Sequence, residues 1–280
     1  MANISEKLSK QDIAEIVESA QLELWKQFFE GCSPAFKQKM GIQSHAFGGA
    51  SATMMESYPT LFYNRVLGLG IKQPATEAML DEIIELYSQH KLSLRIPLSP
   101  YAQPGDLPAW LDDRGFKKTG NLAKMIRGNE PPPRIETDLR VKRVDASDAA
   151  QFGDIFSRAF GWPDWSAQMA EEMIRMGIVY SYIAYDGDVP AASGVLHVSG
   201  DVGGLYHAAT LPEFRRRGAQ GAIMARRIQD GIDLGCRWFS TETGEEKPES
   251  PNPSYHNMLR TGFELAYLRP MYELQPKPSA

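Results

Sequence analysis

The sequence predicts an α/β (α+β) fold arranged as two domains, and three observations lead to this prediction. The chain has 280 residues, whereas domains usually contain about 100–200 residues each. Candidate strands alternate with candidate helices through the carboxy-terminal half. The elements that end this half recur, in the same order, about half a chain earlier.

Composition and charge exclude several classes of protein. Hydrophobic residues make up 42% and charged residues 23% of the chain, as in a soluble globular protein. The 30 basic and 35 acidic residues give a formal charge of −5, so any cationic site must be local. Two cysteines are too few for a cysteine-based zinc site and fit a reducing cytoplasm, and we expect no metal. The start lacks an apolar signal region and no stretch is apolar enough to span a bilayer, so we expect neither secretion nor membrane insertion.

A proline-rich stretch marks the boundary between the predicted domains. Three consecutive prolines begin at Pro131, and such a run bars regular hydrogen bonding and holds the backbone extended. We therefore predict a first domain over residues 1–127, a linker over 128–136 and a second domain over 137–280.

The elements of the second domain follow from hydrophobic spacing and turn signals. Asp186 and Gly187 are typical of a hairpin between two strands. Met224, Ile228 and Ile232 repeat at helical spacing. In chain order the candidates are a strand at 138–144, helices at 146–160 and 166–176, strands at 178–185, 190–199 and 204–210, a helix at 219–234, and strands at 237–243 and 264–274.

A short helix is predicted just before the last strand. Asn252 can cap its first turn, Pro253 suits its first position and Gly262 can end it.

The first half repeats this ending at one constant offset. A Gly-Phe pair after a short helix occurs at Gly262 and again at Gly115, an offset of 262 − 115 = 147 residues. At the same offset, the helix at 219–234 falls on a helical pattern at 75–88, and the strand at 239–243 falls on 92–96. These agreements favour a duplicated domain, and the alternative is that a common helix–strand junction occurs twice by chance.

Residues 206–222 predict a strand, a basic turn and the start of a helix, which together favour anion binding. The first N–H groups of a helix lack internal partners, the helix dipole favours negative charge there, and glycines let a phosphate approach the main chain. Arg215, Arg216 and Arg217 add positive charge beside those groups. The alternative is a solvated basic run, but arginines beside a helix N-terminus are unfavourable without an anion.

The same turn resembles motif A of the GCN5-related N-acetyltransferases, which reads Arg/Gln-x-x-Gly-x-Gly/Ala. Arg215 and Gly218 match the first arginine and the first glycine. Gln220 departs from the motif, although Gly221 follows it immediately. The resemblance extends to the order of elements from 138 to 274. A Gly-x-x-x-x-Gly-Lys-Ser/Thr motif and a complete dinucleotide fingerprint are both absent from the sequence.

The resemblance implies both a fold and a cofactor. Each domain is expected to contain a mixed central β-sheet flanked by helices, and acetyl-CoA is expected to bind across the splayed ends of two parallel strands. The implied cofactor-binding residues are Ala209, Thr210 and Leu211 for the pantetheine arm, Arg215, Arg216, Arg217, Gly218, Ala219, Gln220, Gly221 and Ala222 for the pyrophosphate, and Asn252 and Ser254 beside the thioester and the cofactor arm.

The first domain departs from motif A. At the offset of 147 residues, Gly218 falls on Ile71 and Gly221 falls on Pro74, with no arginine run nearby. We therefore expect a degenerate domain that binds no CoA and that shapes or covers the acceptor site.

The resemblance also implies direct attack by an acceptor amine on the thioester, which needs a base, main-chain N–H donors and an acid. Many relatives use as acid a tyrosine four residues before the glycine of Gly-Phe, but Met258 stands there in this chain. Tyr255 on the same helix is the nearest replacement, and the alternative is a tyrosine packed against the sheet. His207 and Glu242 are the candidate bases. The alternatives are a packed core histidine and a carboxylate that hydrogen-bonds the following loop.

Trp162, Asp164 and Trp165 lie between the first two helices of the second domain, where relatives recognise acceptors. They are candidates for an aromatic and acidic pocket that takes a cation. The alternative is an ordinary packed corner.

The sequence thus predicts an acyltransferase, a cytoplasmic acetyl-CoA-dependent N-acetyltransferase that acts on a small-molecule amine as a monomer or homodimer. The alternative is a non-catalytic acyl-CoA-binding or regulatory protein, which Met258 at the usual acid position favours. A nucleic-acid partner is disfavoured, because the basic residues form one short cluster without an aromatic platform.

Overall fold

Residues 8–276 are described by a computed structural model, and their contacts divide the chain into two units. Unit 1 contains the chain up to Lys124 and again from Ala266, and unit 2 runs from Met125 to Leu265. The division differs from the predicted domains, because the sequence places the whole last strand in the second domain. Within the described residues, no helix has the length and apolar character needed to cross a membrane.

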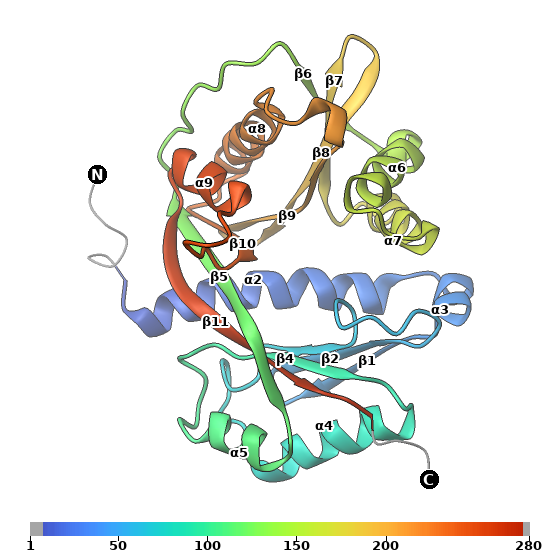
Figure 1. Cartoon of the computed structure of the whole chain (residues 1–280), viewed down its shortest axis with the longest axis vertical. Coiled ribbons are helices and arrows are strands. Elements are labelled where there is room, and N and C mark those ends of the chain that lie inside the picture. Colours follow the sequence, from blue (N-terminus) through green and yellow to red (C-terminus); the bar gives the residue numbers. More distant parts are fainter. Residues whose placement is uncertain (1–7, 277–280) are drawn as a thin grey trace. The chain divides into compact units, whose positions relative to one another are not determined.

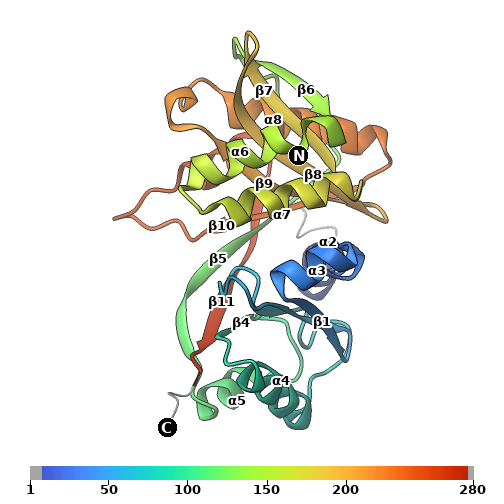
Figure 2. The ribbon, with the colours of Figure 1, turned by 90° about the vertical axis from the view of Figure 1, so that its right-hand side faces the viewer.

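Unit 2 contains a mixed sheet with helices on both faces (Figures 1 and 2). Its elements are the end of β5 (Lys117–Gly128), then β6 (Arg140–Val144), α6 (Ala149–Phe160), α7 (Asp164–Arg175), β7 (Tyr180–Asp186), β8 (Val189–Ser199), β9 (Val202–Thr210), α8 (Ala219–Asp233), β10 (Trp238–Gly244) and α9 (Pro253–Arg260). The strands lie in the order β5-β10-β9-β8-β7-β6, antiparallel from β6 to β9 and parallel between β9 and β10. Helices α6 and α7 cover one face of this sheet, and α8 covers the other.

The turn and helix signals of the sequence account for this unit. The predicted hairpin is confirmed, since Asp186 pairs with Val189 and Gly187 turns the chain at a φ of +58°. Of the predicted apolar stripe of α8, Met224 and Ile228 are buried and Ile232 is half-buried. Asn252 caps α9, because its side-chain oxygen accepts hydrogen bonds from the main-chain N–H groups of the first turn.

Unit 1 is a second α/β unit with its own core. Its elements are α2 (Lys10–Gly31), α3 (Pro34–Met40), β1 (Ile42–Phe47), β2 (Ala50–Met55), β3 (Arg65–Leu67), α4 (Glu77–Gln89), β4 (Leu94–Pro97), α5 (Leu107–Asp113), most of β5, and most of β11 (Glu264–Leu274). The strands lie in the order β1-β2-β3-β4-β11-β5, with β3 and β4 parallel and β4 and β11 antiparallel. The core packs α4 and α5 against these strands.

The last four elements of the two halves follow the same order, at offsets close to the predicted 147 residues. Strand β11 begins at Glu264 and β5 begins at Lys117, and 264 − 117 = 147. Helix α9 corresponds to α5 (253 − 107 = 146), β10 to β4 (238 − 94 = 144) and α8 to α4 (219 − 77 = 142). Each final strand, however, joins the sheet of the other half, since β11 pairs with β4 and β5 neighbours β10. This exchange explains why the unit boundaries differ from those predicted.

A buried polar network holds β11 in unit 1. Arg269 is fully buried, and its Nη1 donates to Glu18 Oε2 at 2.7 Å and to Gln21 Oε1 at 2.9 Å. Tyr267 donates from its hydroxyl to Glu18 Oε1 at 2.7 Å, and Lys124 Nζ donates to Gln21 at 3.2 Å. Because buried charges need such partners, the network specifies where β11 docks on α2.

Candidate functional site

Strands β9 and β10 of unit 2 diverge part of the way along their length. Their parallel pairing runs from Val202 opposite Trp238 to Gly204 opposite Ser240 and then stops. One further link joins them, where Thr241 Oγ1 donates to the Leu205 carbonyl at 2.8 Å. Beyond it β9 continues along β8 alone. This end of the pairing, called the opening below, is the kind of strand divergence that the resemblance implies.

A β-bulge lies at this opening. Ser193 pairs with Ala209 and Val195 pairs with Tyr206, so two residues of β9 stand opposite one residue of β8. His207 is one of the two, and its φ of +47° lies in the left-handed region that non-glycine residues seldom adopt. The candidate base is therefore part of a main-chain irregularity that turns β9 beside the opening.

The basic turn leads from the bulged strand into α8. Arg216 has a φ of +66°, and Gly218 has a φ of +78° at the N-cap of α8. No side chain caps this helix N-terminus. Arg215 and Arg216 are exposed. The turn therefore presents uncapped main-chain N–H groups and two cations, an arrangement suited to a phosphate.

Arg217, which the sequence groups with its two neighbours, has its charge compensated within the protein. Its guanidinium donates to Asp186 at 2.6 Å and also to Asp138. The hydrogen bonds from Arg217 hold the pKa of both carboxyl groups below the ordinary value. The Arg217 side chain thus links the turn to the residues just before β6 and to the end of β7.

The glycines of the turn face the segment 135–137 of the same chain. A Cβ at Gly218 would lie 2.9 Å from the carbonyl oxygen of Glu136, and one at Gly221 would lie 3.2 Å from the Ile135 side chain. Thr137 Oγ1 donates to the Arg217 carbonyl at 2.7 Å. Sequence reasoning missed this contact: the segment 135–137, at the end of the predicted linker, packs against the turn.

Gln220, the departure from motif A, fastens the turn to β9. Its Nε2 donates to the Ala209 carbonyl and to Thr210 Oγ1, each at 2.8 Å. The amide therefore links the first turn of α8 to the end of the strand that lines the opening.

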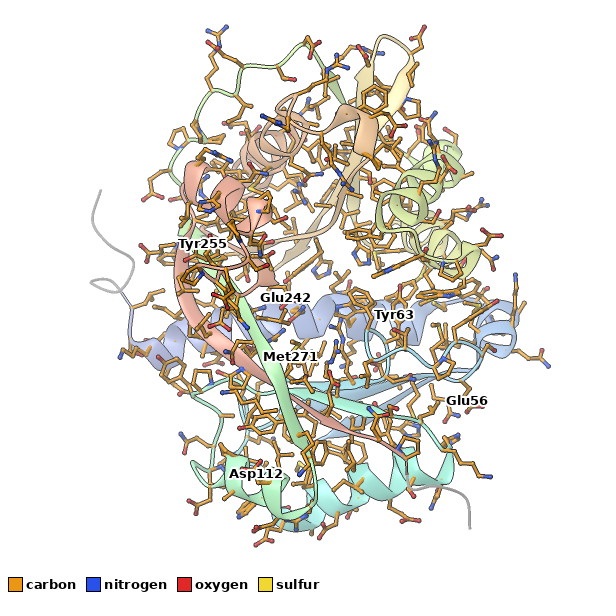
Figure 3. The ribbon with its side chains drawn as sticks, viewed as in Figure 1. Glu56, Tyr63, Asp112, Glu242, Tyr255 and Met271 are labelled. Carbon is orange, nitrogen blue, oxygen red and sulfur yellow. The ribbon has the colours of Figure 1, made fainter. Side chains whose placement is uncertain are left out.

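Helix α9 and strand β10 carry two of the candidate catalytic residues, Tyr255 and Glu242 (Figure 3). Both are half-buried. Among the described residues, the Tyr255 hydroxyl takes part in no hydrogen bond, whereas Asn252 uses its amide fully. The Asn252 Nδ2 group donates to Thr243 and to a β10 carbonyl, and its oxygen caps α9. This favours a structural role for Asn252, while Ser254 is exposed.

The candidate acceptor residues form an aromatic cluster that reaches His207. The Phe156 ring lies 5.3 Å from that of His207 and 5.6 Å from that of Trp162, and Trp162 stacks on Trp165 at 6.0 Å. Asp164 is exposed and lies in the first turn of α7. The structure thus links the two tryptophans to the candidate base through Phe156.

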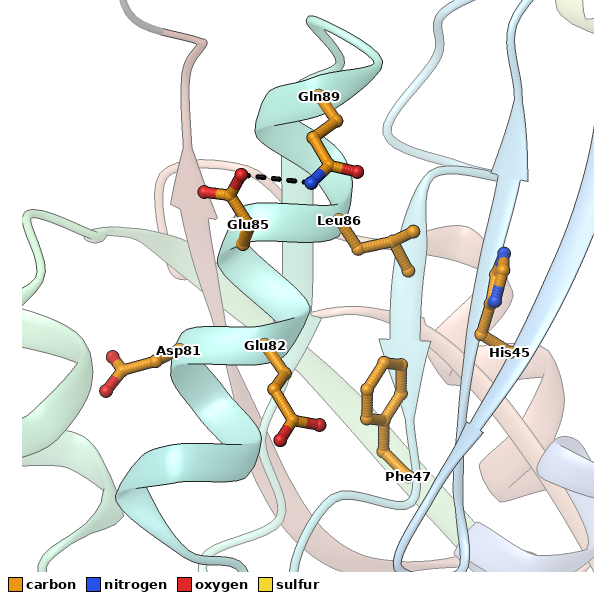
Figure 4. Close-up of a pocket in the computed structure, with 7 residues that line it drawn as sticks. All are labelled: His45, Phe47, Asp81, Glu82, Glu85, Leu86 and Gln89. Carbon is orange, nitrogen blue, oxygen red and sulfur yellow. Dashed lines mark hydrogen bonds between the residues drawn. The ribbon is translucent and has the colours of Figure 1, made fainter.

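Unit 1 contains a groove of about 470 Å³ between α4 and β1 (Figure 4). Its lining residues are His45, Phe47, Asp81, Glu82, Glu85, Leu86 and Gln89. Arg114 Nε donates to Asp81 Oδ1 at 2.6 Å, and Gln89 Nε2 donates to Glu85 Oε1 at 3.0 Å. None of these residues belongs to the predicted site. Across the described part of the chain, no three His, Cys, Asp or Glu side chains gather in a way that could hold a metal ion.

Comparisons with known proteins match one segment of the chain to a family model and the whole chain to solved folds. A family model of the acetyltransferase (GNAT) domain matches residues 137–247. A search of curated proteins finds no match. A GCN5-related N-acetyltransferase from Kribbella flavida is 15% identical with a TM-score of 0.63, covering 93% of this chain and 95% of that chain. A tandem GNAT protein from the clavulanic acid biosynthesis pathway is 13% identical with a TM-score of 0.65, covering 100% and 98%. A GCN5-related N-acetyltransferase from Sphaerobacter thermophilus is 13% identical with a TM-score of 0.59, covering 96% and 95%.

At these identities the solved structures show the fold, a mixed sheet flanked by helices, over nearly the whole chain. The family match covers the opening, the bulge, the basic turn and α8. Residues 137–247 therefore form an acetyltransferase domain of the GCN5-related N-acetyltransferase family.

Proposed function

We propose that this protein is an acetyl-CoA-dependent N-acetyltransferase that acts on the amine of a small acceptor. The observation that carries the proposal is the opening between β9 and β10, which leads to an uncapped helix N-terminus beside a basic turn. An elongated ligand with an anionic end fits this arrangement, because main-chain groups can hold its arm and the helix end can hold its phosphates.

The residues of the turn fit the pyrophosphate of CoA. Arg215 and Arg216 are exposed beside the α8 N-terminus, and Gly218 adopts the left-handed conformation that aligns the first N–H groups. We assign the pantetheine arm to Ala209, Thr210 and Leu211. Acetyl-CoA would supply the acetyl thioester.

Chemistry at the site requires two proton transfers. The amine nitrogen forms a bond to the thioester carbonyl carbon, the C–S bond breaks, a base takes the proton from nitrogen and an acid protonates the sulfur. We propose His207 or Glu242 as the base and Tyr255 as the acid. The half-buried position of Tyr255 and its unengaged hydroxyl support this role.

We place the acceptor at the aromatic cluster of α6 and α7. Trp162 is half-buried in this cluster and stacks on Trp165, and aromatic rings favour the binding of an organic cation. The link through Phe156 to His207 would bring the acceptor to the base.

Unit 1 is proposed to bind no CoA. Thr76 caps its helix α4, since Thr76 Oγ1 accepts from the Met79 N–H at 3.1 Å. The positions equivalent to Gly218 and Gly221 are Ile71 and Pro74, and a proline has no N–H to offer a phosphate. We therefore expect one CoA site per chain.

A second candidate function is binding of acyl-CoA without catalysis. It is favoured by Met258, which is buried and stands where many relatives carry the acidic tyrosine.

Two measurements test these functions. Isothermal titration with CoA should give a stoichiometry near one per chain, and two sites would contradict the assignment to unit 2 alone. Release of free CoA thiol from acetyl-CoA, measured over a panel of amines, amino acids and antibiotics, should rise with an acceptor. Product mass should increase by one acetyl group. CoA binding without thiol release across the panel would favour the non-catalytic function, and absence of CoA binding would overturn both.

A further inference from the structure

One arginine of helix α8, Arg227, is buried in the interior of unit 2. Arg227 is 1% exposed and lies on the buried face of α8. Among the described residues, no carboxylate lies within ion-pair distance of it. Burial lowers the pKa of Arg227 to about 10, so its guanidinium is still charged at neutral pH. Burying a cation without a counter-charge is unfavourable. The hydrogen-bond partners of Arg227 must therefore compensate for the loss of water.

The partners of Arg227 are main-chain carbonyls at the bulge. Its Nη1 donates to the Val195 carbonyl at 2.9 Å and to the Tyr206 carbonyl at 3.3 Å, and its Nε donates to the Ile223 carbonyl at 3.4 Å. Val195 and Tyr206 form the last regular pair of β8 and β9 before the bulge. The guanidinium therefore forms hydrogen bonds to both strands at the point where their register changes.

Gly194 completes this arrangement from the side of β8. It stands opposite the two bulged residues, and a Cβ there would lie 3.0 Å from Arg227 Cζ and 3.1 Å from Nη1. Glycine at this position thus leaves the space that the guanidinium occupies. The bulge, Gly194 and Arg227 fit one another as one local structure.

The Tyr206 carbonyl belongs to the peptide group whose N–H is that of His207. A cation that donates to the carbonyl oxygen draws electron density from the peptide and makes its N–H a stronger donor, because hydrogen bonds along a chain polarise one another. The same hydrogen bond fixes the orientation of this peptide group. The group is followed by the N–Cα bond of His207, whose φ is unusual.

We propose that Arg227 is a positioning residue for acyl transfer, which orients and polarises the bulged main chain of β9 so that it can stabilise the thioester carbonyl oxygen as negative charge develops there. This inference rests on the proposed function. Arg227 acts through the peptide and touches neither substrate nor cofactor. Donors fixed in advance toward a developing oxyanion are an effective means of lowering an activation barrier.

Three variants separate this role from folding and cofactor binding. Arg227→Lys keeps a charge but loses the planar fork. Gly194→Ala keeps the arginine but presses a methyl group against its guanidinium and against Ile223 Cγ2. Arg226→Met is the matched control, because Arg226 is the neighbouring arginine of α8, is exposed and pairs with Asp230 four residues on. Each variant is assayed for its thermal melt, its CoA affinity, its kcat and its acceptor KM.

The expected result is a selective loss of rate. Arg227→Lys and Gly194→Ala should lower kcat about 10- to 100-fold, with CoA affinity and acceptor KM changed less than about threefold. Arg226→Met should retain the wild-type values. Folded variants of Arg227 and Gly194 that keep the wild-type kcat would overturn the proposal.

A spectroscopic measurement tests the wild-type protein directly. Acetyl-CoA labelled with ¹³C at the thioester carbonyl should show a lower infrared stretching frequency when bound than when free. The shift should shrink in Arg227→Lys and Gly194→Ala and persist in Arg226→Met. An unshifted carbonyl in wild-type protein that binds CoA and turns over would refute this inference while leaving the proposed function intact. Failure of wild-type protein to bind CoA would refute the proposed function itself.

Discussion

Gly218 is constrained in two ways at the scale of a single residue. Its φ of +78° is unfavourable for other residues, and a Cβ would press on the Glu136 carbonyl at 2.9 Å. We predict that Gly218→Val weakens CoA binding tenfold or more, and that Arg216→Ala weakens it less and in a salt-dependent manner, since Arg216 is one of several screened charges. Titration calorimetry at two salt concentrations measures both. Wild-type affinity in a folded Gly218→Val protein would contradict the phosphate site.

Arg217 gives the turn a pH-dependent stability. Hydrogen bonds from Arg217 lower the pKa of Asp138 and Asp186 in the folded state. The stabilisation is therefore fully present above the ordinary carboxyl pKa of about 3.9 and is lost as pH falls through the lowered values. Arg217→Met should melt below the wild type at pH 7, and the two melting temperatures should converge under acid. A difference that stays constant from pH 7 to pH 3 would rule out this cause.

The proposed proton transfers make separate predictions. Tyr255→Phe should lower kcat by roughly ten- to a thousandfold with little change in CoA affinity, because the hydroxyl acts mainly as the thiolate leaves. His207→Asn removes the imidazole but tolerates the left-handed φ, and it should flatten the acidic limb of the pH–rate profile. Full turnover in both variants, measured with a confirmed acceptor, would show that neither side chain transfers a proton.

At the scale of elements, the segment 135–137 supports the turn without being part of it. Thr137 Oγ1 donates to the Arg217 carbonyl at 2.7 Å and accepts from the Leu139 N–H at 3.2 Å. Thr137→Val should lower the free energy of unfolding by about 1–2 kcal/mol and weaken CoA binding, whereas Thr137→Ser should behave like the wild type. Urea unfolding and titration measure the two effects. Equal stability of the Val and Ser variants would exclude the hydroxyl as the cause.

The sequence predicts those elements that local chemistry defines. The last strand is confirmed at Glu264–Leu274, and α8 ends one residue before the predicted 234, because apolar spacing and terminal glycines are local signals. No element before residue 75 was predicted, so the 22-residue α2 was missed. The contact between segment 135–137 and the turn depends on packing between distant residues, which no local pattern specifies.

The candidate site is predictable to a similar degree. The basic turn, the bulged strand and α9 lie together in unit 2 and carry the predicted residues. A signal for Arg227 was present, since it follows Ile223 by four positions and Met224 by three and therefore falls on the apolar face of α8. The dual ion pair of Arg217 had no such signal, because Asp138 and Asp186 are remote in sequence.

At the scale of the whole molecule, the network around Arg269 attaches the last strand, β11, to helix α2 near the start of the chain. Glu18→Gln leaves a fully buried guanidinium without its counter-charge, and we predict a loss of about 3–5 kcal/mol in the free energy of unfolding. Asp154→Asn is the control, because it breaks an exposed pair with Arg158 on α6 and should change stability by less than about 1 kcal/mol. Equal effects of the two substitutions in urea unfolding would show that the buried pair contributes no more than a surface pair.

Because β11 lies next to β4 and β5 lies next to β10, the two halves of the sequence are not separable modules. A gene truncated within the proline-rich segment encodes one fragment that lacks the strand next to β4 and another that lacks the strand next to β10. Each product therefore lacks one strand of its sheet, although each carries a full copy of the repeated elements. Removal of the first half would leave β10 without its neighbour β5, whether or not that half binds CoA.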